Sequence, residues 1–122
     1  MQHAEAFLKL VNEAKARIKQ TNADEVARRL QAGDKLTIID VREDNEWQQG
    51  HVKDAIHLGK GVIERDVESR FPDKNQELIL YCGGGFRSAL AADALRQMGY
   101  KRAISMDGGW KAWKEKHLPI EA

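Results

Sequence analysis

The chain has 122 residues, of which 42% are hydrophobic and 32% are charged, and this profile is typical of one folded domain. Its 20 basic and 19 acidic residues give a net charge of +1, so the charge balance gives no reason to expect nucleic acid or an anionic membrane as a partner. The single cysteine excludes an internal disulfide and a cysteine-based zinc site, and the four histidines lack metal-ligand spacing. We therefore expect neither a metal nor a cofactor.

The first 20 residues, MQHAEAFLKLVNEAKARIKQ, lack the basic start and the uninterrupted apolar run of a signal peptide. The sequence also shows no apolar stretch long enough to predict a membrane span. We therefore expect a cytoplasmic protein, either a monomer or a weak homodimer, with no nucleic acid and no membrane among its partners.

The first predicted element is an amphipathic helix over residues 3–15, in which apolar residues recur at helical spacing. We expect residues 1–17 to form an appended N-terminal helix and residues 18–122 to form the main domain. This helix packs on the domain or serves a partner protein.

From residue 18 onward, predicted strands alternate with predicted helices. In chain order they are a strand at 18–20, a helix at 23–31, a strand at 35–40, a loop with a short helix at 42–50, a strand at 54–58, a helix at 61–71, a strand at 77–82, a helix at 87–99, a strand at 102–106 and a helix at 108–117. This alternation predicts an α/β domain with a mostly parallel sheet that is covered by helices on both faces.

The stretch YCGGGFRS, residues 81–88, places Cys82 between the clearest strand and the clearest helix. In open α/β sheets, functional sites gather at the carboxyl ends of the strands. The three glycines that follow leave backbone N–H groups free to surround an anion, and the start of the helix adds its positive dipole end. We interpret Cys82 as a nucleophile with an anion pocket. The alternative is a small buried cysteine that closes a strand before a glycine turn.

The spacing between Cys82 and Arg87 separates two kinds of chemistry. Cysteine phosphatases use Cys-x5-Arg, a loop large enough to wrap a phosphate, whereas four residues, 83–86, separate the two side chains here. A tetrahedral phosphoryl group would fit this shorter loop poorly, and a single transferred sulfur atom would fit it well. Phosphatase or arsenate reductase activity is therefore disfavoured.

Three segments resemble, in the right order, the signatures of the rhodanese domain in its single-domain sulfurtransferase form. IIDVREDNEWQQGHVKDAIHL is similar to the first signature, LYCGGGFRSA resembles the six-residue active loop from Cys82 to Arg87, and SMDGGWKAW resembles the C-terminal signature. The resemblance covers residues 20–118 and implies a five-stranded parallel sheet with helices on both faces. It also implies that Cys82 takes a sulfane sulfur from a small donor, holds it as a persulfide and passes it to a thiophilic acceptor.

The active loop after Cys82 is expected to bind the substrate and consists of Gly83, Gly84, Gly85, Phe86, Arg87 and Ser88. Arg87 is expected to order this loop and to add positive potential. Asp40, at the end of a strand near the same sheet edge, either hydrogen-bonds the loop or caps the next turn. Arg42 and Glu46 are expected to form an ion pair that fixes the segment after that strand.

Other residues near these motifs are expected to have structural roles. His51 is expected to hydrogen-bond backbone, and Gly108 and Gly109 are expected to permit a close backbone approach at the rim of the site. The three tryptophans are expected to pack in the core and at the rim: Trp47, Trp110 and Trp113.

The active loop has no side-chain cation before Arg87, although the family's thiosulfate-preferring sulfurtransferases often carry one. We therefore predict weak use of thiosulfate and better use of a persulfide donor. Because the chain has no second cysteine, turnover needs an external acceptor: cyanide, a thiol or a sulfur-accepting protein.

The sequence leaves two hypotheses open. The first is a sulfurtransferase, and the second is a persulfide carrier or regulatory module that docks on a partner. The helix at 3–15 motivates the second.

Overall fold

The computed structural model describes residues 3–122. The helices are α1 (Glu5–Arg17), α2 (Ala23–Gln31), α3 (Asp44–Gln49), α4 (Lys60–Arg70), α5 (Phe86–Gln97) and α6 (Gly109–Glu115). The strands are β1 (Lys19–Asn22), β2 (Ile38–Asp40), β3 (His51–Val52), β4 (Ile56–His57), β5 (Leu78–Tyr81), β6 (Ala103–Asp107) and β7 (Ile120–Glu121).

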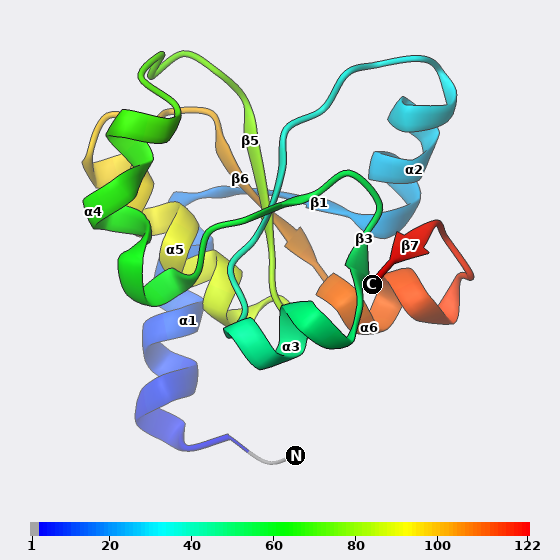
Figure 1. Cartoon of the computed structure of the whole chain (residues 1–122). Helices are drawn as coiled ribbons and strands as arrows, with labels where there is room; N and C mark the ends of the chain where they lie inside the picture. The colour runs from blue at the N-terminus through cyan, green and yellow to red at the C-terminus, as the bar shows by residue number, and fades with distance from the viewer. Residues whose placement is uncertain (1–2) are drawn as a thin grey trace.

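Five strands form one parallel sheet in the order β1-β6-β5-β2-β4. Helices α4 and α5 cover one face of this sheet, and α2 and α6 cover the other (Figure 1). The predicted α/β fold, a five-stranded parallel sheet with helices on both faces and an N-terminal helix, is confirmed.

Strand β5 shows why the sheet is buried on both sides. All four of its residues are buried, as expected for a central parallel strand with a continuous apolar sequence. Because side chains alternate across a strand, Leu78 and Leu80 join the core beneath α4 and α5, whereas Ile79 and Tyr81 join the core beneath α2 and α6. Cys82 continues this alternation and lies on the α5 side.

The N-terminal helix α1 packs against the outside of α5 (Figure 1). It buries Val11 and Ala14 completely, and Arg17 at its end donates two hydrogen bonds to Asp93 of α5, at 3.1 and 2.8 Å. The helix runs two residues beyond its predicted end at residue 15, to this ion pair. No helix within residues 3–122 has the length and apolarity needed to cross a membrane.

A short antiparallel pair, β3 with β7, lies outside the main sheet and was not predicted. Each strand has two residues, too few to show a period-2 pattern in the sequence. The pair places the end of the chain beside β3, where the backbone N–H of Asp54 donates to the Glu121 carboxylate at 2.9 Å. Local sequence patterns predict the main elements and their order. They do not predict this pairing, because it joins residues that are far apart in the chain.

Candidate active site

Cys82 directly follows β5 and begins the loop that leads into α5. Its side chain belongs to the core and the residue is only 1% exposed. It nevertheless lines a pocket of about 300 Å³ together with His3, Phe7, Gly84, Phe86 and Arg87. Cys82 therefore lies at the carboxyl end of a central strand, at the bottom of a small pocket, which is the location that the sequence predicts.

Polar groups from the loop and from the first turn of α5 converge on the sulfur of Cys82. The backbone N–H groups of Gly85 and Ser88 donate to Sγ at 3.2 and 3.3 Å, and the Ser88 hydroxyl lies 3.5 Å from Sγ. The buried Ser105 hydroxyl lies 2.8 Å from the Ser88 hydroxyl and fixes its position. Donors fixed in this arrangement stabilise negative charge on the sulfur.

The start of α6 holds the peptide groups of the loop in this orientation. The Cys82 carbonyl accepts a hydrogen bond from Trp110 N–H at 2.8 Å, and the Gly83 carbonyl accepts one from Lys111 N–H at 3.0 Å. A Cβ on Gly109 would lie 2.3 Å from the Cys82 carbonyl oxygen, and this glycine has a φ of +49°. The predicted close backbone approach is therefore confirmed at Gly109, whereas a Cβ on Gly108 would meet the Ala112 side chain, at 2.9 Å.

The three loop glycines are not equivalent. Gly85 has a φ of +105°, and a Cβ there would lie 3.1 Å from an oxygen of Asp107 and 3.2 Å from the backbone nitrogen of Gly108. A Cβ on Gly83 would approach the Arg87 guanidinium at 3.2 Å. At Gly84, a Cβ would meet no atom of the described chain within 4 Å. The backbone geometry therefore requires glycine at Gly85, whereas Gly84 leaves open space at the mouth of the pocket.

Arg87 links the active loop to α3. Its guanidinium donates two hydrogen bonds to the Glu46 carboxylate, at 2.8 and 3.1 Å. This interaction is the main reason that the pKa of Glu46 lies below its ordinary value, against the opposing effect of desolvation. Arg87 thus connects the first turn of α5 to α3, and Glu46 offsets much of its positive charge. Its predicted role in ordering the loop stays a prediction.

The predicted ion pair between Arg42 and Glu46 is wrong. The two residues are four apart in the sequence, but α3 begins only at Asp44, so they do not share a helical face. Glu46 instead faces Arg87 and accepts a hydrogen bond from Glu43 N–H at 3.1 Å, as part of a capping box. Arg42 turns inward to a different carboxylate.

That carboxylate is Asp40, which is fully buried, and the Arg42 side chain is 3% exposed. Arg42 donates to Asp40 through its guanidinium, at 2.8 Å for the shortest contact, and through its backbone N–H at 2.9 Å. It also donates to the Gly50 carbonyl at 2.7 Å. Of the two predicted roles of Asp40, the cap of the next turn is confirmed. Its side-chain hydrogen bonds within residues 3–122 run to Arg42 and Tyr81, not to the active loop.

Tyr81 connects this buried pair to the active loop, and sequence analysis missed it. Its hydroxyl donates to Asp40 at 2.7 Å and accepts from Val52 N–H at 3.0 Å. Burial, followed by the negative charge of Asp40, raises the pKa of Tyr81, so the phenol stays protonated and donates. Because Tyr81 directly precedes Cys82, the network of Asp40, Arg42 and Tyr81 fixes the backbone from which the loop departs. The available signal was a polar aromatic residue within a buried strand.

The remaining aromatic residues occupy structural positions. The Nδ1 atom of His51 lies 3.1 Å from the Trp47 carbonyl oxygen, which confirms the predicted backbone hydrogen bond, and the two rings stack with centroids 3.4 Å apart. Trp113 is buried in the core. Trp110 is partly buried against the same core, with the Arg42 guanidinium 4.7 Å from its ring centre. The described residues contain no group of three or more His, Cys, Asp or Glu side chains placed to hold a metal ion.

Residues 22–116 match the family described as "Rhodanese-like domain". A protein named sulfurtransferase from Allochromatium vinosum is 31% identical over 105 residues, which span 86% of this chain and 96% of that protein. A thiosulfate sulfurtransferase, GlpE, from Coxiella burnetii is 30% identical over 87 residues, which span 71% of this chain and 79% of that protein.

Solved structures show the same architecture. A polysulfide-sulfur transferase homodimer from Wolinella succinogenes has a TM-score of 0.78 at 28% identity, covering 95% of this chain and 87% of that one. A protein of unknown function from Rhodopseudomonas palustris, described as a possible tyrosine phosphatase, has a TM-score of 0.86 at 25% identity. That alignment covers 99% of this chain and 98% of the other, so the likeness includes the N-terminal helix.

Proposed function

The chain belongs to the rhodanese-like sulfurtransferase family, and on that premise we propose that it transfers a sulfane sulfur from a donor to a thiophilic acceptor through a persulfide on Cys82. The observation that carries the proposal is the group of donors around Sγ, the N–H groups of Gly85 and Ser88 at 3.2 and 3.3 Å. These donors stabilise a thiolate before transfer and a persulfide anion after it.

The first half-reaction loads the cysteine. The Cys82 thiolate attacks the outer sulfur of a persulfide donor R–S–SH; a new S–S bond forms as the donor S–S bond breaks. The electron pair leaves with R–S⁻, and Cys82 becomes Cys–S–SH, which loses its proton to give Cys–S–S⁻. The 300 Å³ pocket above the sulfur gives the added atom room.

The second half-reaction discharges the cysteine. Cyanide attacks the outer sulfur of Cys–S–S⁻, the S–S bond breaks, and thiocyanate leaves while the Cys82 thiolate is restored. A thiolate acceptor R′–S⁻ attacks Cys–S–SH in the same way and leaves as R′–S–SH. Each half-reaction is a displacement at sulfur, so neither needs an external oxidant or reductant.

The charges around the pocket favour a donor whose reacting sulfur group carries at most one negative charge. Arg87 is bound to Glu46 by two hydrogen bonds, so its charge is largely offset, and Gly84 and Phe86 add no charge to the pocket lining. Transfer of a dianion out of water into such a pocket is costly. We therefore infer that thiosulfate is a poor donor and that a persulfide is a better one.

The donor comparison is made with cyanide as acceptor, by measuring kcat/KM for thiosulfate and for glutathione persulfide. We expect the persulfide value to be at least about tenfold higher, equivalent to about 1.4 kcal/mol in transition-state stabilisation. A clear preference for thiosulfate, the activity named for the Coxiella burnetii relative, would contradict this inference.

Mass spectrometry after treatment with a persulfide tests the intermediate. We expect one added sulfur atom on the wild-type chain and none on Cys82→Ser, followed by loss of that sulfur on addition of cyanide. Stoichiometric loading that is never followed by turnover would support the second hypothesis, a persulfide carrier. Hydrolysis of p-nitrophenyl phosphate that depends on Cys82 would instead support a phosphatase.

A further inference from the structure

Two elements far apart in the sequence meet at the mouth of the Cys82 pocket. The ring of His3, just before α1, lies with its centroid 4.7 Å from that of Phe86 at an interplanar angle of 79°. Phe7 of α1 lies 6.2 Å from Phe86 at 76°, and His3 and Phe7 are 5.3 Å apart. These three residues, which we call the aromatic wall, line the same pocket as the Cys82 side chain.

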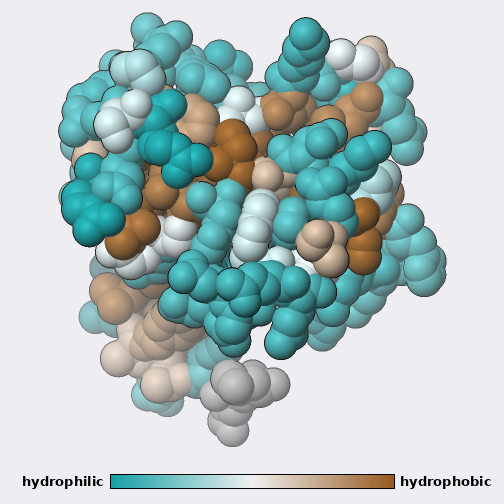
Figure 2. All heavy atoms as spheres, in the orientation of Figure 1, coloured by the Kyte–Doolittle hydropathy of each residue, from teal (hydrophilic) through white to brown (hydrophobic). Residues whose placement is uncertain are grey.

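Helix α1 lies at this pocket because it packs on α5, the helix that covers the Cys82 side of the sheet. In Figure 2 much of the visible surface over α1 is tan, on the hydrophobic side of the scale, with some hydrophilic atoms among it, whereas the surface over α3 is hydrophilic. The N-terminal helix therefore adds apolar surface beside a loop that otherwise borders charged groups.

Contacts along α1 hold the aromatic wall in position. Arg17 binds Asp93 of α5 through two hydrogen bonds. Two residues earlier, the Lys15 ammonium lies 5.1 Å from the centre of the Phe86 ring and 3.5 Å from the Asp107 carboxylate. The helix is thus attached both to α5 and to the end of β6.

The residues that line the pocket are mostly uncharged. Of its six described residues, Arg87 alone carries a permanent charge, and that charge is paired with Glu46. The Phe7 and Phe86 rings gain from contact with hydrocarbon or with another ring, and they offer an anion no strong hydrogen bond. We propose, resting on the sulfur transfer proposed above, that the aromatic wall binds the organic group R of a persulfide donor R–S–SH. In this role α1 selects persulfides of small apolar or aromatic thiols over inorganic sulfur anions.

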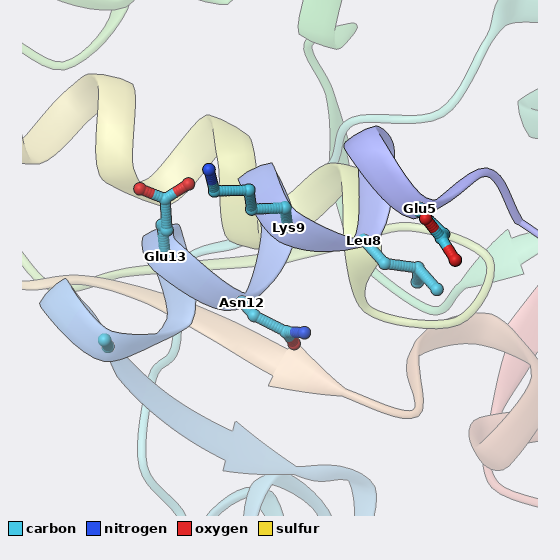
Figure 3. A pocket seen from close by; sticks show the side chains of 6 residues that line it. Glu5, Leu8, Lys9, Asn12 and Glu13 are labelled. Carbon is cyan, nitrogen blue, oxygen red and sulfur yellow. The ribbon is translucent and has the colours of Figure 1, made fainter.

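The opposite side of α1 supplies a matched control. This side is a shallow, open surface formed entirely by residues of α1: Glu5, Leu8, Lys9, Asn12, Glu13 and Ala16. Figure 3 shows the first five of these side chains along the helix. Cys82 is not among the residues that line it. Leu8→Ala therefore removes apolar surface next to Phe7 in the sequence without changing the Cys82 pocket.

The first test does not depend on sulfur transfer. The rate of alkylation of Cys82 is measured with iodoacetamide and with N-phenyliodoacetamide, and the ratio of the two rates is compared with that of a free thiol. We expect the wild-type protein to favour the phenyl reagent by about tenfold, and Phe7→Ala to remove most of that preference. Leu8→Ala should keep it. His3→Ala, outside the helix, should reduce it by about threefold without affecting folding.

An unchanged ratio in both Phe7→Ala and His3→Ala, or a wild-type ratio equal to that of a free thiol, would overturn the proposal.

The second test measures kcat/KM for benzyl persulfide and for inorganic hydrogen disulfide, HSS⁻. Phe7→Ala should lower the benzyl value by about tenfold and leave the inorganic value within about twofold. Equal losses for both donors would overturn it as well. If no donor loads Cys82, the proposed sulfur transfer fails, while the alkylation ratio still decides whether the wall selects apolar groups.

Discussion

Arg42 and Arg87 both lie at the carboxyl edge of the sheet, in opposite surroundings. The side chains of Arg42 and Asp40 are 3% and 0% exposed, whereas those of Arg87 and Glu46 are 34% and 32% exposed. Removal of one partner from a buried pair leaves an uncompensated charge in the interior. Water screens a half-exposed pair and limits its effect on stability. The difference indicates that Arg42 maintains the scaffold below the loop, whereas Arg87 positions the loop itself.

The largest expected effect is a loss of stability when the buried pair of Asp40 and Arg42 is broken. Asp40→Asn removes the charge that compensates Arg42 and weakens the hydrogen bond from Tyr81, so we expect a loss of roughly 3–5 kcal/mol in the free energy of unfolding. Urea denaturation of wild type, Asp40→Asn and Glu46→Gln measures it. A loss in Asp40→Asn that is no larger than the loss in Glu46→Gln would remove the distinction between scaffold and loop.

The next effect concerns the loop glycines. Gly85→Ala places a side chain at a φ of +105° and within 3.1 Å of Asp107, so we expect a loss of about 1–3 kcal/mol in stability. It should also slow sulfur loading, because the Gly85 N–H that donates to Sγ moves. Gly84→Ala is the matched control, since its Cβ enters open space, and it should leave both quantities near wild type. Equal effects of the two substitutions would contradict the loop geometry.

In the partly exposed pair of Arg87 and Glu46, Arg87→Lys should lower catalytic activity much more than it lowers stability. Lysine keeps the charge but loses the two parallel hydrogen bonds to Glu46, so we expect a loss of less than about 1 kcal/mol in stability. The kcat/KM for persulfide should fall by roughly tenfold, because a misplaced loop lowers the rate more than it lowers stability. Steady-state kinetics and denaturation of the same preparation check both values. A large loss of stability with normal kinetics would reverse the assigned roles.

The smallest expected effect is a pH dependence. The hydrogen bond from Arg87 holds the pKa of Glu46 below its ordinary value. Glu46 therefore stabilises the fold at pH values above the ordinary glutamate range, and this contribution disappears as pH falls through the lower pKa of the folded state. The difference in unfolding free energy between wild type and Glu46→Gln should shrink below about pH 4. A difference that stays constant from neutral to acid pH would contradict the ion pair.

Local chemistry explains what the sequence could predict. The position of Cys82 followed from a buried strand, a glycine run and a helix that are consecutive in the chain, and the close approach at Gly109 followed from two adjacent glycines. The mostly parallel sheet with helices on both faces followed from regular alternation of strand and helix patterns, and its five strands followed from the resemblance to the rhodanese domain. Each of these features depends on residues that are neighbours in the sequence or on a pattern that recurs along it.

Long-range partners explain what the sequence could not predict. Arg42 was assigned to Glu46 on sequence proximity, but the fold brings Asp40 to Arg42 and brings Arg87, 41 residues away, to Glu46. Tyr81 was treated as part of an apolar strand, although its hydroxyl closes the buried network. The contribution of His3 and Phe7 to the pocket depends on how α1 docks on α5, which an amphipathic pattern alone leaves open.

The central claim is that Cys82 alternates between a thiolate and a persulfide during turnover. The most direct measurement is the rate of thiocyanate formation from cyanide and glutathione persulfide, together with the sulfur content of Cys82 during the steady state. We expect many equivalents of thiocyanate per protein, a Cys82 persulfide that forms and decays fast enough to support that rate, and neither product nor persulfide in Cys82→Ser. Thiocyanate formation at an undiminished rate by Cys82→Ser would contradict it.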